Sequence, residues 1–258
     1  MKKRLVWLFA LLLSITTFAV CGPIAEVWCW ASCYLGVPYV SGTLDVSGEE
    51  RLVLDTTGLD CTTFVELSVA RRLAMHDTLA FEQHVQALRY RNGVIDGYLS
   101  RLHYFSDWVS ENTRRGVWFE LSPSSPSGIW RNDTLALAFM SCHPNYYPYL
   151  KNNAWAVDSM RTIERRYTGL PFSYIAKEYL NLSPSQLPIR DGDIIALVTT
   201  IEGLDVTHLG FAVWVDEKLY LMHASMSHRK VVIDDRTLYD YLKDRSSCPG
   251  VRVVRLCR

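Results

Sequence analysis

The sequence predicts an α+β protein in which N-terminal helices pack on a C-terminal antiparallel sheet. Apolar residues recur with helical spacing through the first two thirds of the chain, and the last third changes to the two-residue alternation of β-strands. Helices followed by a run of neighbouring strands are typical of α+β folds. Lys plus Arg and Asp plus Glu both number 27, so no bulk charge indicates a nucleic-acid partner.

The start of the chain predicts export. Met1–Arg4 is basic, and Leu5–Val20 is an uncharged apolar run, shorter than the roughly 20 residues that a membrane-spanning helix needs. Small residues suit cleavage before Gly22, which makes residues 1–21 a signal peptide. Two alternatives stay open. In the first, Cys21 would carry a lipid that brings the protein to a membrane, although Val20 stands where lipoprotein signals have a smaller residue. In the second, the apolar run would be kept as a membrane anchor.

The remaining chain, residues 22–258, suits one domain. Helical patterns are followed by strand patterns along it. The predicted helices are 23–35, 61–76, 81–90, a short helix around Trp108, 133–142, 152–167 and 237–244. The predicted strands are 193–199, 206–215, 219–224, 230–233 and 251–256.

Cys61 stands where a loop becomes a helix. Gly58 and Asp60 interrupt the preceding pattern, and an apolar helical pattern follows from Phe64. A thiol at a helix N-terminus faces unpaired N–H groups and the positive end of the helix dipole, which favour the nucleophilic thiolate. The alternative is a core cysteine, because free cysteine is among the most buried residue types.

Two histidines are the candidate partners of a cysteine nucleophile, which needs a base and a group that orients the base. His208 alternates with apolar residues on the predicted strand 206–215, and Gly210 leaves room beside it for a helix N-terminus. A hairpin turn at residues 216–217 would place His223 on the same face, about 7–8 Å away on the diagonal. A one-residue change of register would turn His223 to the other face. Together, the two histidines indicate a catalytic pair.

Seven cysteines in an exported chain raise the question of disulfides. A nucleophilic Cys61 must stay unpaired, and a bond between Cys248 and Cys257 is one open pairing. Cys29 and Cys33 lack a second ligand pair with the spacing of a metal site. The sequence therefore predicts neither a metal nor another cofactor.

The motifs occur in the order of a known family. The chain resembles the NlpC/P60 cell-wall hydrolases in the segments 36–39, 59–65, 190–195, 207–212 and 222–225. It resembles more closely the DUF1460 branch, which is N-acetylmuramoyl-L-alanine amidase-like, in the segments 90–93, 101–108 and 203–208. Thr62 and Thr63 follow Cys61 where the wider family commonly has Ser and then Gly, which favours this branch.

The resemblance implies a papain-like NlpC/P60 fold, with residues about 90–150 as a helical and loop insertion that forms part of the substrate groove. Cys61 matches the nucleophile, His208 the base and His223 the residue that orients the base. The residues expected to bind substrate are Tyr39, His103, Tyr104, Trp108, His143, Thr207 and Ser225.

The implied activity is that of a periplasmic cysteine amidase. It would hydrolyse the amide between N-acetylmuramic acid, in its ordinary or its 1,6-anhydro form, and L-Ala of peptidoglycan fragments. Cys61 would form an acyl-enzyme with the lactyl carbonyl, and peptidoglycan or muropeptide fragments would be the partners. Two alternatives stay open: an endopeptidase that cuts the stem peptide between D-Glu and the diamino acid, and a catalytically idle wall-binding protein.

Overall fold

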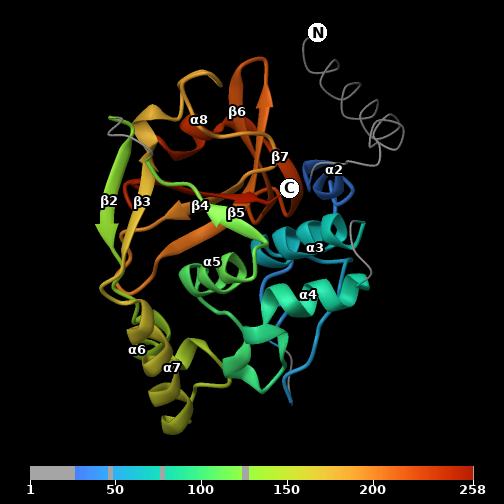
Figure 1. Cartoon of the computed structure of the whole chain (residues 1–258), viewed down its shortest axis with the longest axis vertical. Coiled ribbons are helices and arrows are strands. Elements are labelled where there is room, and N and C mark those ends of the chain that lie inside the picture. Colours follow the sequence, from blue (N-terminus) through green and yellow to red (C-terminus); the bar gives the residue numbers. More distant parts are fainter. Residues whose placement is uncertain (1–26, 46–48, 76–78, 124–127, 258) are drawn as a thin grey trace.

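The structure, a computed structural model, describes residues 27–45, 49–75, 79–123 and 128–257 (Figure 1). The predicted signal peptide and Cys21 lie outside these residues. Within the described part of the chain, no helix combines the length and apolar character needed to cross a bilayer.

Helices and strands follow one another along the chain as expected for a mixed fold. The α-helices are α2 (Val27–Ser32), α3 (Cys61–Ala74), α4 (Phe81–Arg89), α5 (Phe105–Arg114), α6 (Phe139–Cys142), α7 (Ala154–Tyr167) and α8 (Leu238–Leu242). Short 3₁₀ turns are η1 (Arg91–Gly93), η2 (Tyr98–Ser100), η3 (Pro144–Tyr146) and η4 (Lys177–Tyr179). The strands are β1 (Trp118–Glu120), β2 (Trp130–Thr134), β3 (Pro171–Ala176), β4 (Ile194–Val198), β5 (Val206–Val215), β6 (Lys218–Ser225), β7 (Lys230–Thr237) and β8 (Gly250–Leu256).

The strands form one eight-stranded sheet. Its order is β2-β3-β8-β4-β5-β6-β7, with β1 paired to β8 beside this path, and every pairing is antiparallel. The predicted α+β class with an antiparallel sheet is therefore confirmed. Strands β4 to β7, which lie together in the sheet, are also consecutive in sequence, as short turns require.

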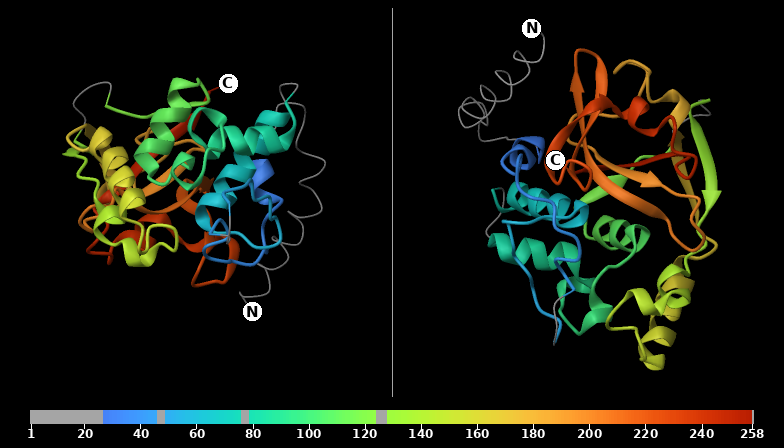
Figure 2. Two further views of the ribbon diagram at one scale, coloured as in Figure 1. Left: turned by 90° about the horizontal axis from the view of Figure 1, so that it is seen from below. Right: turned by 180° about the vertical axis from the view of Figure 1, so that it is seen from behind.

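The two faces of the sheet bury different cores, because successive side chains of a strand point to opposite faces. In β4, Ile194 and Ala196 join the core that packs against α3 and α5. Ile195 and Leu197 join the core that packs against α8. Figure 2 shows α3 and α4 stacked beside the sheet, in agreement with this division. The start of α3 is thereby fixed against the middle strands.

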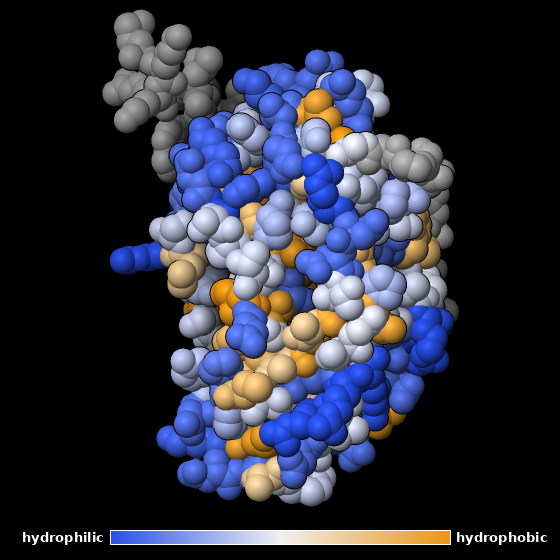
Figure 3. All heavy atoms as spheres, turned by 90° about the vertical axis from the view of Figure 1, so that its left-hand side faces the viewer, coloured by the Kyte–Doolittle hydropathy of each residue, from blue (hydrophilic) through white to orange (hydrophobic). Residues whose placement is uncertain are grey.

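A third core lies between η2, α6 and α7 and contains Tyr98, Tyr104, Leu150 and Met160. Helices α6 and α7 lie below the sheet in Figure 1 and are joined to it by β2, which precedes α6, and β3, which follows α7. On the side of the molecule that carries them, apolar side chains form a band across the middle of a mainly hydrophilic surface (Figure 3).

Most predicted elements are found within a few residues of their expected bounds, but the predicted helix 133–142 is wrong. Residues 130–134 form β2, and only the last four residues of the predicted segment are helical. Asn132, Asp133 and Thr134 are weak helix formers, and they pair with β3, a strand that is distant in sequence. Strands β1, β2 and β3 were not predicted, because β1 and β2 are short and all three depend on non-local pairing.

Candidate active site

A reciprocal cap fixes Cys61 as the first residue of α3. The Asp60 carboxylate accepts a hydrogen bond from Thr63 N at 2.8 Å, and Asp60 N donates to Thr63 Oγ1 at 3.0 Å. This capping box satisfies two backbone donors that a helix start otherwise leaves unpaired. The thiol is therefore held at a helix N-terminus, as the sequence predicts.

The β5–β6 hairpin brings the two histidines together. Val215 pairs with Lys218 across the turn, where Asp216 and Glu217 both have positive φ, as a tight hairpin requires. His208 Nε2 lies 2.6 Å from His223 Nδ1, so the two rings share one hydrogen bond. Their planes are nearly perpendicular, at 85°.

Strand β6 and the N-terminus of α3 both lie beside His208. A Cβ on Gly210 would lie 2.7 Å from Met222 O and 3.0 Å from His223 Cβ. Strand β6 therefore fills the space over Gly210 itself. The N-terminus of α3 does lie beside His208, since Cys61 and Thr62 line one cavity with it, while the rest of α3 packs on Leu209 and Phe211.

Gly210→Ala should lower both stability and activity, because the new methyl group must push β6 and His223 away. Overpacking of this kind costs about 1–3 kcal/mol, which thermal unfolding would detect. Gly128→Ala is the matched control, since a Cβ at Gly128 meets nothing within 4 Å. Equal melting temperatures and activities for the two variants would contradict the close contact.

His223 has a second polar neighbour, Asp234 on β7. His223 Nε2 lies 3.5 Å from Asp234 Oδ2, and both side chains are almost fully buried, at 1% and 0% exposure. Arg236 holds the carboxylate through contacts of its guanidinium, 3.0 Å to Oδ1 and 3.1 Å to Oδ2. Asp234 was not predicted as a site residue, because the predicted strand 230–233 ends one residue before it.

Burial keeps the two imidazoles neutral. It lowers the pKa of His208 to about 3, and the proximity of His223 and Arg245 adds to the shift, because a charged His208 would be repelled there. Burial also lowers the pKa of His223 to about 4, although Asp234 opposes this shift. Both rings therefore carry a single proton at neutral pH, and His208 is available as a base.

The thiol differs from the expectation of a low pKa. Burial raises the pKa of Cys61 to about 11, and the negative charge of Asp60 adds to the shift. Hydrogen bonds from Leu209 N–H and the Thr62 side chain lower the pKa, but by less than burial raises it. The resting pair is therefore a neutral thiol and a neutral imidazole, and the helix N-terminus alone does not create a thiolate.

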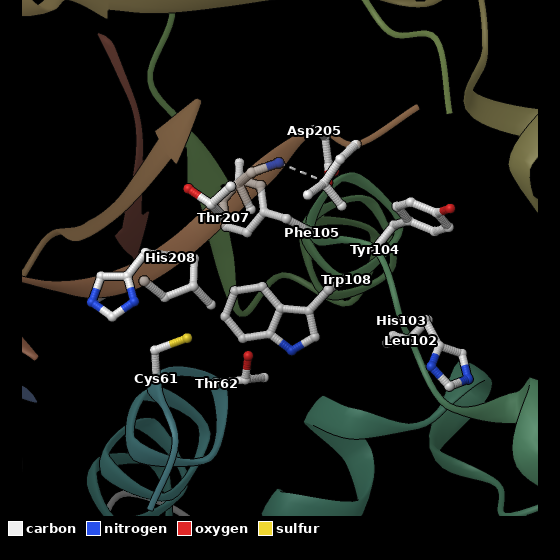
Figure 4. Close-up of a pocket in the computed structure, with 13 residues that line it drawn as sticks. Cys61, Thr62, Leu102, His103, Tyr104, Phe105, Trp108, Asp205, Thr207 and His208 are labelled. Atoms are coloured by element: carbon white, nitrogen blue, oxygen red, sulfur yellow. Dashed lines mark hydrogen bonds between the residues drawn. The ribbon is translucent and has the colours of Figure 1, made fainter. Parts of the chain in front are cut away.

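Cys61 and His208 line one cavity of about 120 Å³. Cys61 and Thr62 reach it from α3, Trp108 from α5, and Thr207 and His208 from β5 (Figure 4). His208 turns its Nδ1 side toward Cys61, which is the ring nitrogen that does not contact His223. The cavity thus contains a thiol, a base and an aromatic wall.

Four of the expected substrate residues line this cavity: His103, Tyr104, Trp108 and Thr207. Trp108 lies beside Cys61, whereas the Tyr104 hydroxyl points away from it and donates to Glu164 at 2.7 Å (Figure 4). His103 Nε2 lies 2.9 Å from Tyr98 O, and burial lowers the pKa of His103 to about 3. Of these four residues, Trp108 therefore lies nearest to the thiol in Figure 4.

The other three expected residues do not line this cavity. Tyr39 forms a bridge with Leu59, and its pKa is raised by burial and then by the charge of Cys61, so it is a neighbour of the thiol. His143 is exposed and stacks on Tyr146, and it does not line the cavity. Ser225 does not line it either; its hydroxyl contacts His228 Nδ1 at 3.1 Å.

Asp205 is a cavity residue that the sequence analysis missed. Its carboxylate accepts hydrogen bonds from Ser106 N at 2.7 Å and Val206 N at 2.9 Å, which ties the start of β5 to the start of α5. An acidic residue directly before a strand that carries a candidate base was the available signal.

The described cysteines and metal-ligating side chains form neither the open disulfide pairing nor a metal site. Cys248 is buried, with its thiol 3.4 Å from Gly250 O, and Cys257 is exposed, so the two do not pair. No group of His, Cys, Asp or Glu side chains in the described ranges has the arrangement of a metal site.

Known proteins share this architecture. An N-acetylmuramoyl-L-alanine amidase from Bacteroides uniformis superposes with a TM-score of 0.83 at 38% identity, over 92% of this chain and 100% of that one. A Bacteroides fragilis protein, crystallised under a provisional assignment as a xylanase, gives 0.80 at 39% identity, over 88% and 99%. A DUF1460 protein from Legionella pneumophila shares the fold, with 0.67 at 19% identity, over 94% and 91%.

Comparison with curated proteins finds no match. The AmiA-like family, described as N-acetylmuramoyl-L-alanine amidase-like, matches residues 30–251. Since this match spans most of the chain, the protein belongs to the N-acetylmuramoyl-L-alanine amidase-like family.

Proposed function

We propose that this protein is a cysteine amidase that hydrolyses the bond between N-acetylmuramic acid and L-Ala in peptidoglycan fragments. The observation that carries the proposal is the shared cavity of Cys61 and His208, with His223 2.6 Å behind the base. A nucleophile, a base and an orienting group are the parts that acyl transfer requires. The papain-like NlpC/P60 relationship belongs to the same proposal.

Each step of the mechanism moves one proton between named groups. His208 Nδ1 takes the thiol proton as Cys61 Sγ attacks the lactyl carbonyl, and the backbone N–H at the start of α3 stabilises the oxyanion. The imidazolium then protonates the nitrogen of L-Ala, which leaves as a free amine. Water attacks the thioester as it gives a proton to His208, and the imidazolium returns this proton to the departing Cys61 sulfur. The muramic acid is released and its carboxyl proton passes to solvent, which leaves the Cys61 thiol and neutral His208 as at the start.

The neutral resting pair makes the reaction depend on general-base catalysis, because no thiolate is present before the attack. With the thiol pKa near 11 and the imidazole pKa near 3, the proton moves to His208 only as the carbonyl is attacked.

The cavity volume limits which part of the substrate it encloses. About 120 Å³ is below the 300–1,000 Å³ of pockets that enclose a drug-sized ligand. We infer that the cavity takes the lactyl group and the L-Ala side chain, with Trp108 as their apolar wall. The sugar then lies on the surface outside the cavity, which is compatible with either an ordinary or a 1,6-anhydro muramic residue.

A glycosidase fits the cavity poorly. Glycoside hydrolysis uses a pair of carboxyl groups on either side of the scissile bond. Among the described residues that line the cavity, Asp205 is the carboxylic acid, and both its oxygens accept backbone hydrogen bonds. The relative with a xylanase assignment therefore does not alter the proposal.

Mass spectrometry of products from a defined set of muropeptides tests the function. The expected products are the free muramic sugar and an intact stem peptide that begins with L-Ala. Cleavage after D-Glu would establish the endopeptidase instead, and binding without any cleavage would establish a wall-binding protein. The set should pair ordinary and 1,6-anhydro forms, so that the sugar requirement is measured in the same experiment.

We also propose that residues 1–21 direct export to the periplasm. Cell fractionation of the full-length chain, with the mass of the mature N-terminus, tests this. A mature chain that begins at Gly22 is expected, whereas a lipid-modified Cys21 or an intact N-terminus would replace the signal-peptide assignment.

A further inference from the structure

Three polar side chains follow one diagonal across neighbouring strands. His208 is on β5, His223 on β6 and Asp234 on β7, and each contacts the next: Nε2 to Nδ1 at 2.6 Å, then Nε2 to Oδ2 at 3.5 Å. We call these three residues the polar relay. Diagonal neighbours on one face of a sheet are within reach of long side chains. The relay starts at the candidate base and ends at a buried carboxylate.

An irregularity in β7 lies next to Asp234. Met222 pairs with Ile233, yet Tyr220 pairs with Thr237, so β7 has two extra residues in this interval. Such a bulge breaks the ladder and redirects side chains, and bulges are common beside active sites. Arg236, within the bulge, donates its backbone N–H and its guanidinium to Asp234.

Arg236 keeps the carboxylate charged despite its burial. Burial alone would raise the pKa of Asp234, but the hydrogen bonds and charge of Arg236 lower it below its usual value. A charged carboxylate can only accept hydrogen bonds. Whatever faces Asp234 Oδ2 must therefore present a proton.

His223 Nε2 is the atom that faces it. This nitrogen is buried and has no hydrogen bond of ordinary geometry, with Asp234 Oδ2 3.5 Å away. Catalytic hydrogen bonds are often long without substrate and shorten in the reacting complex. A neutral imidazole has one donor and one acceptor nitrogen. A proton on Nε2 therefore leaves His223 Nδ1 as an acceptor toward His208.

We propose that Asp234 is a positioning residue that sets the proton positions of His223 and His208, and thereby leaves His208 Nδ1 free to accept the Cys61 proton. His223 donates from Nε2 to Asp234 and accepts at Nδ1. His208 must then donate from Nε2, so its Nδ1 is unprotonated on the side that faces Cys61. No proton leaves the relay; the carboxylate fixes the direction of both hydrogen bonds. The inference rests on the proposed function, because it assumes that Cys61 and His208 react.

Other charged and titratable groups also act on the relay and on the thiol. These groups come from β7, α8 and its following turn, the turn after β6, and the loops before α3: Arg236, Tyr241, Arg245, His228, Tyr39 and Asp60. Arg245 lowers the pKa of both relay histidines, whereas Asp234 raises that of His223. Within the relay itself, Asp234 supplies the negative charge at its end.

Asp234→Asn should reverse the relay. The two donors that reach Oδ1 from Arg236 would hold the amide oxygen there, so the amide NH₂ would take the place of Oδ2 and face His223 Nε2. His223 would then carry its proton on Nδ1, and His208 would carry its proton on Nδ1, where the thiol proton must go. We expect kcat to fall about 100-fold or more, with KM changed less than about threefold.

The order of two variants separates positioning from support of the fold. In Asp234→Ala, the His223 proton can lie on either ring nitrogen, because no side chain at position 234 donates to or accepts from Nε2. This variant should therefore retain more activity than Asp234→Asn. If Asp234 acted only as support, the near-isosteric Asn would retain more activity than Ala. Asp235→Asn is the control, since Asp235 is the neighbouring carboxylate and is 81% exposed. This variant should keep wild-type kinetics.

Two readouts do not need turnover. The rate of iodoacetamide alkylation of Cys61 against pH should shift downward by about one pH unit in Asp234→Asn, because a proton on His208 Nδ1 would donate to the thiolate and stabilise it. In protein labelled with ¹⁵N-histidine, the His223 signals should show Nε2 protonated and Nδ1 unprotonated. His208→Gln and His223→Gln assign these signals. If the wild type cleaves no muropeptide, the proposed function fails, while these two measurements still decide the proton positions.

The activities of the two Asp234 variants decide between a positioning role and a purely structural one. A lower activity of Asp234→Asn than of Asp234→Ala, with the shifted alkylation profile and normal circular dichroism, supports the positioning role. Wild-type kinetics in Asp234→Asn, or greater activity than Asp234→Ala, overturns it. If both variants unfold, the ¹⁵N spectrum of the wild type decides alone: a proton on His223 Nδ1 overturns the proposal, and a proton on Nε2 supports it.

Discussion

Cys61→Ser should reduce amide hydrolysis by about 10⁴-fold or more while the protein remains folded. Serine has nearly the size of cysteine, and the cap of α3 is formed by Asp60 and Thr63 without the thiol, so the helix should be kept. The hydroxyl is a far weaker nucleophile beside a neutral imidazole, because nothing in the cavity lowers its pKa enough. Product formation from the susceptible muropeptide, measured by mass spectrometry, gives the rate.

Cys257→Ser is the control for this prediction, because Cys257 is an exposed cysteine at the far end of the chain. It should retain the wild-type rate. Thermal unfolding of Cys61→Ser checks that the loss is chemical. Retention of substantial hydrolysis in a folded Cys61→Ser protein would eliminate the cysteine mechanism, whichever bond is cleaved.

The parts of the fold that were predicted are those in which pattern and structure are local. Strand β5 has its predicted bounds, because a ten-residue alternation of apolar and small residues leaves little choice of period. Helix α3 begins at the predicted residue, because its cap is built from Asp60 and Thr63 within the same turn. Strands β2 and β3 were missed, since each is stabilised by a partner about forty residues away.

The candidate site was predictable to the same extent. His208 and His223 follow from the hairpin, because a two-residue turn sets the register of the whole pair. Asp234 did not follow, because it is diagonal to His223 and lies at the irregular part of the pairing of β6 with β7. The pKa of Cys61 was predicted to be lowered but is raised, and the reason is related. The helix dipole is visible in sequence, but burial by residues from α5 and β5 is not.

The raised thiol pKa gives His208 a larger role than in an enzyme that rests as a thiolate. A preformed thiolate would keep part of its reactivity without a base, whereas a neutral thiol must lose its proton during attack. The polar relay and the neutral pair are therefore linked: the more firmly Cys61 holds its proton, the more the reaction depends on the accepting nitrogen of His208.

His208→Ala should for this reason lower hydrolysis nearly as much as Cys61→Ser, by about 10⁴-fold. The double variant should be no slower than either single one, since residues of one catalytic unit do not act additively. In the wild type, the acid limb of kcat/KM should lie near pH 3–4, because the base is unprotonated above its pKa of about 3 and protonated below it. The profile should be measured with circular dichroism at each pH, so that acid unfolding is separated from titration.

His84→Ala is the control for the loss of a buried imidazole, because His84 lies on α4 and does not line the cavity. This variant tests whether removing such a ring affects turnover through the fold alone. If His208→Ala retained activity within tenfold of the wild type, a different group would have to accept the thiol proton. If the acid limb of the wild type lay near pH 6–7 instead, His208 would titrate as a solvated imidazole does, and the buried neutral pair would not describe the reacting enzyme.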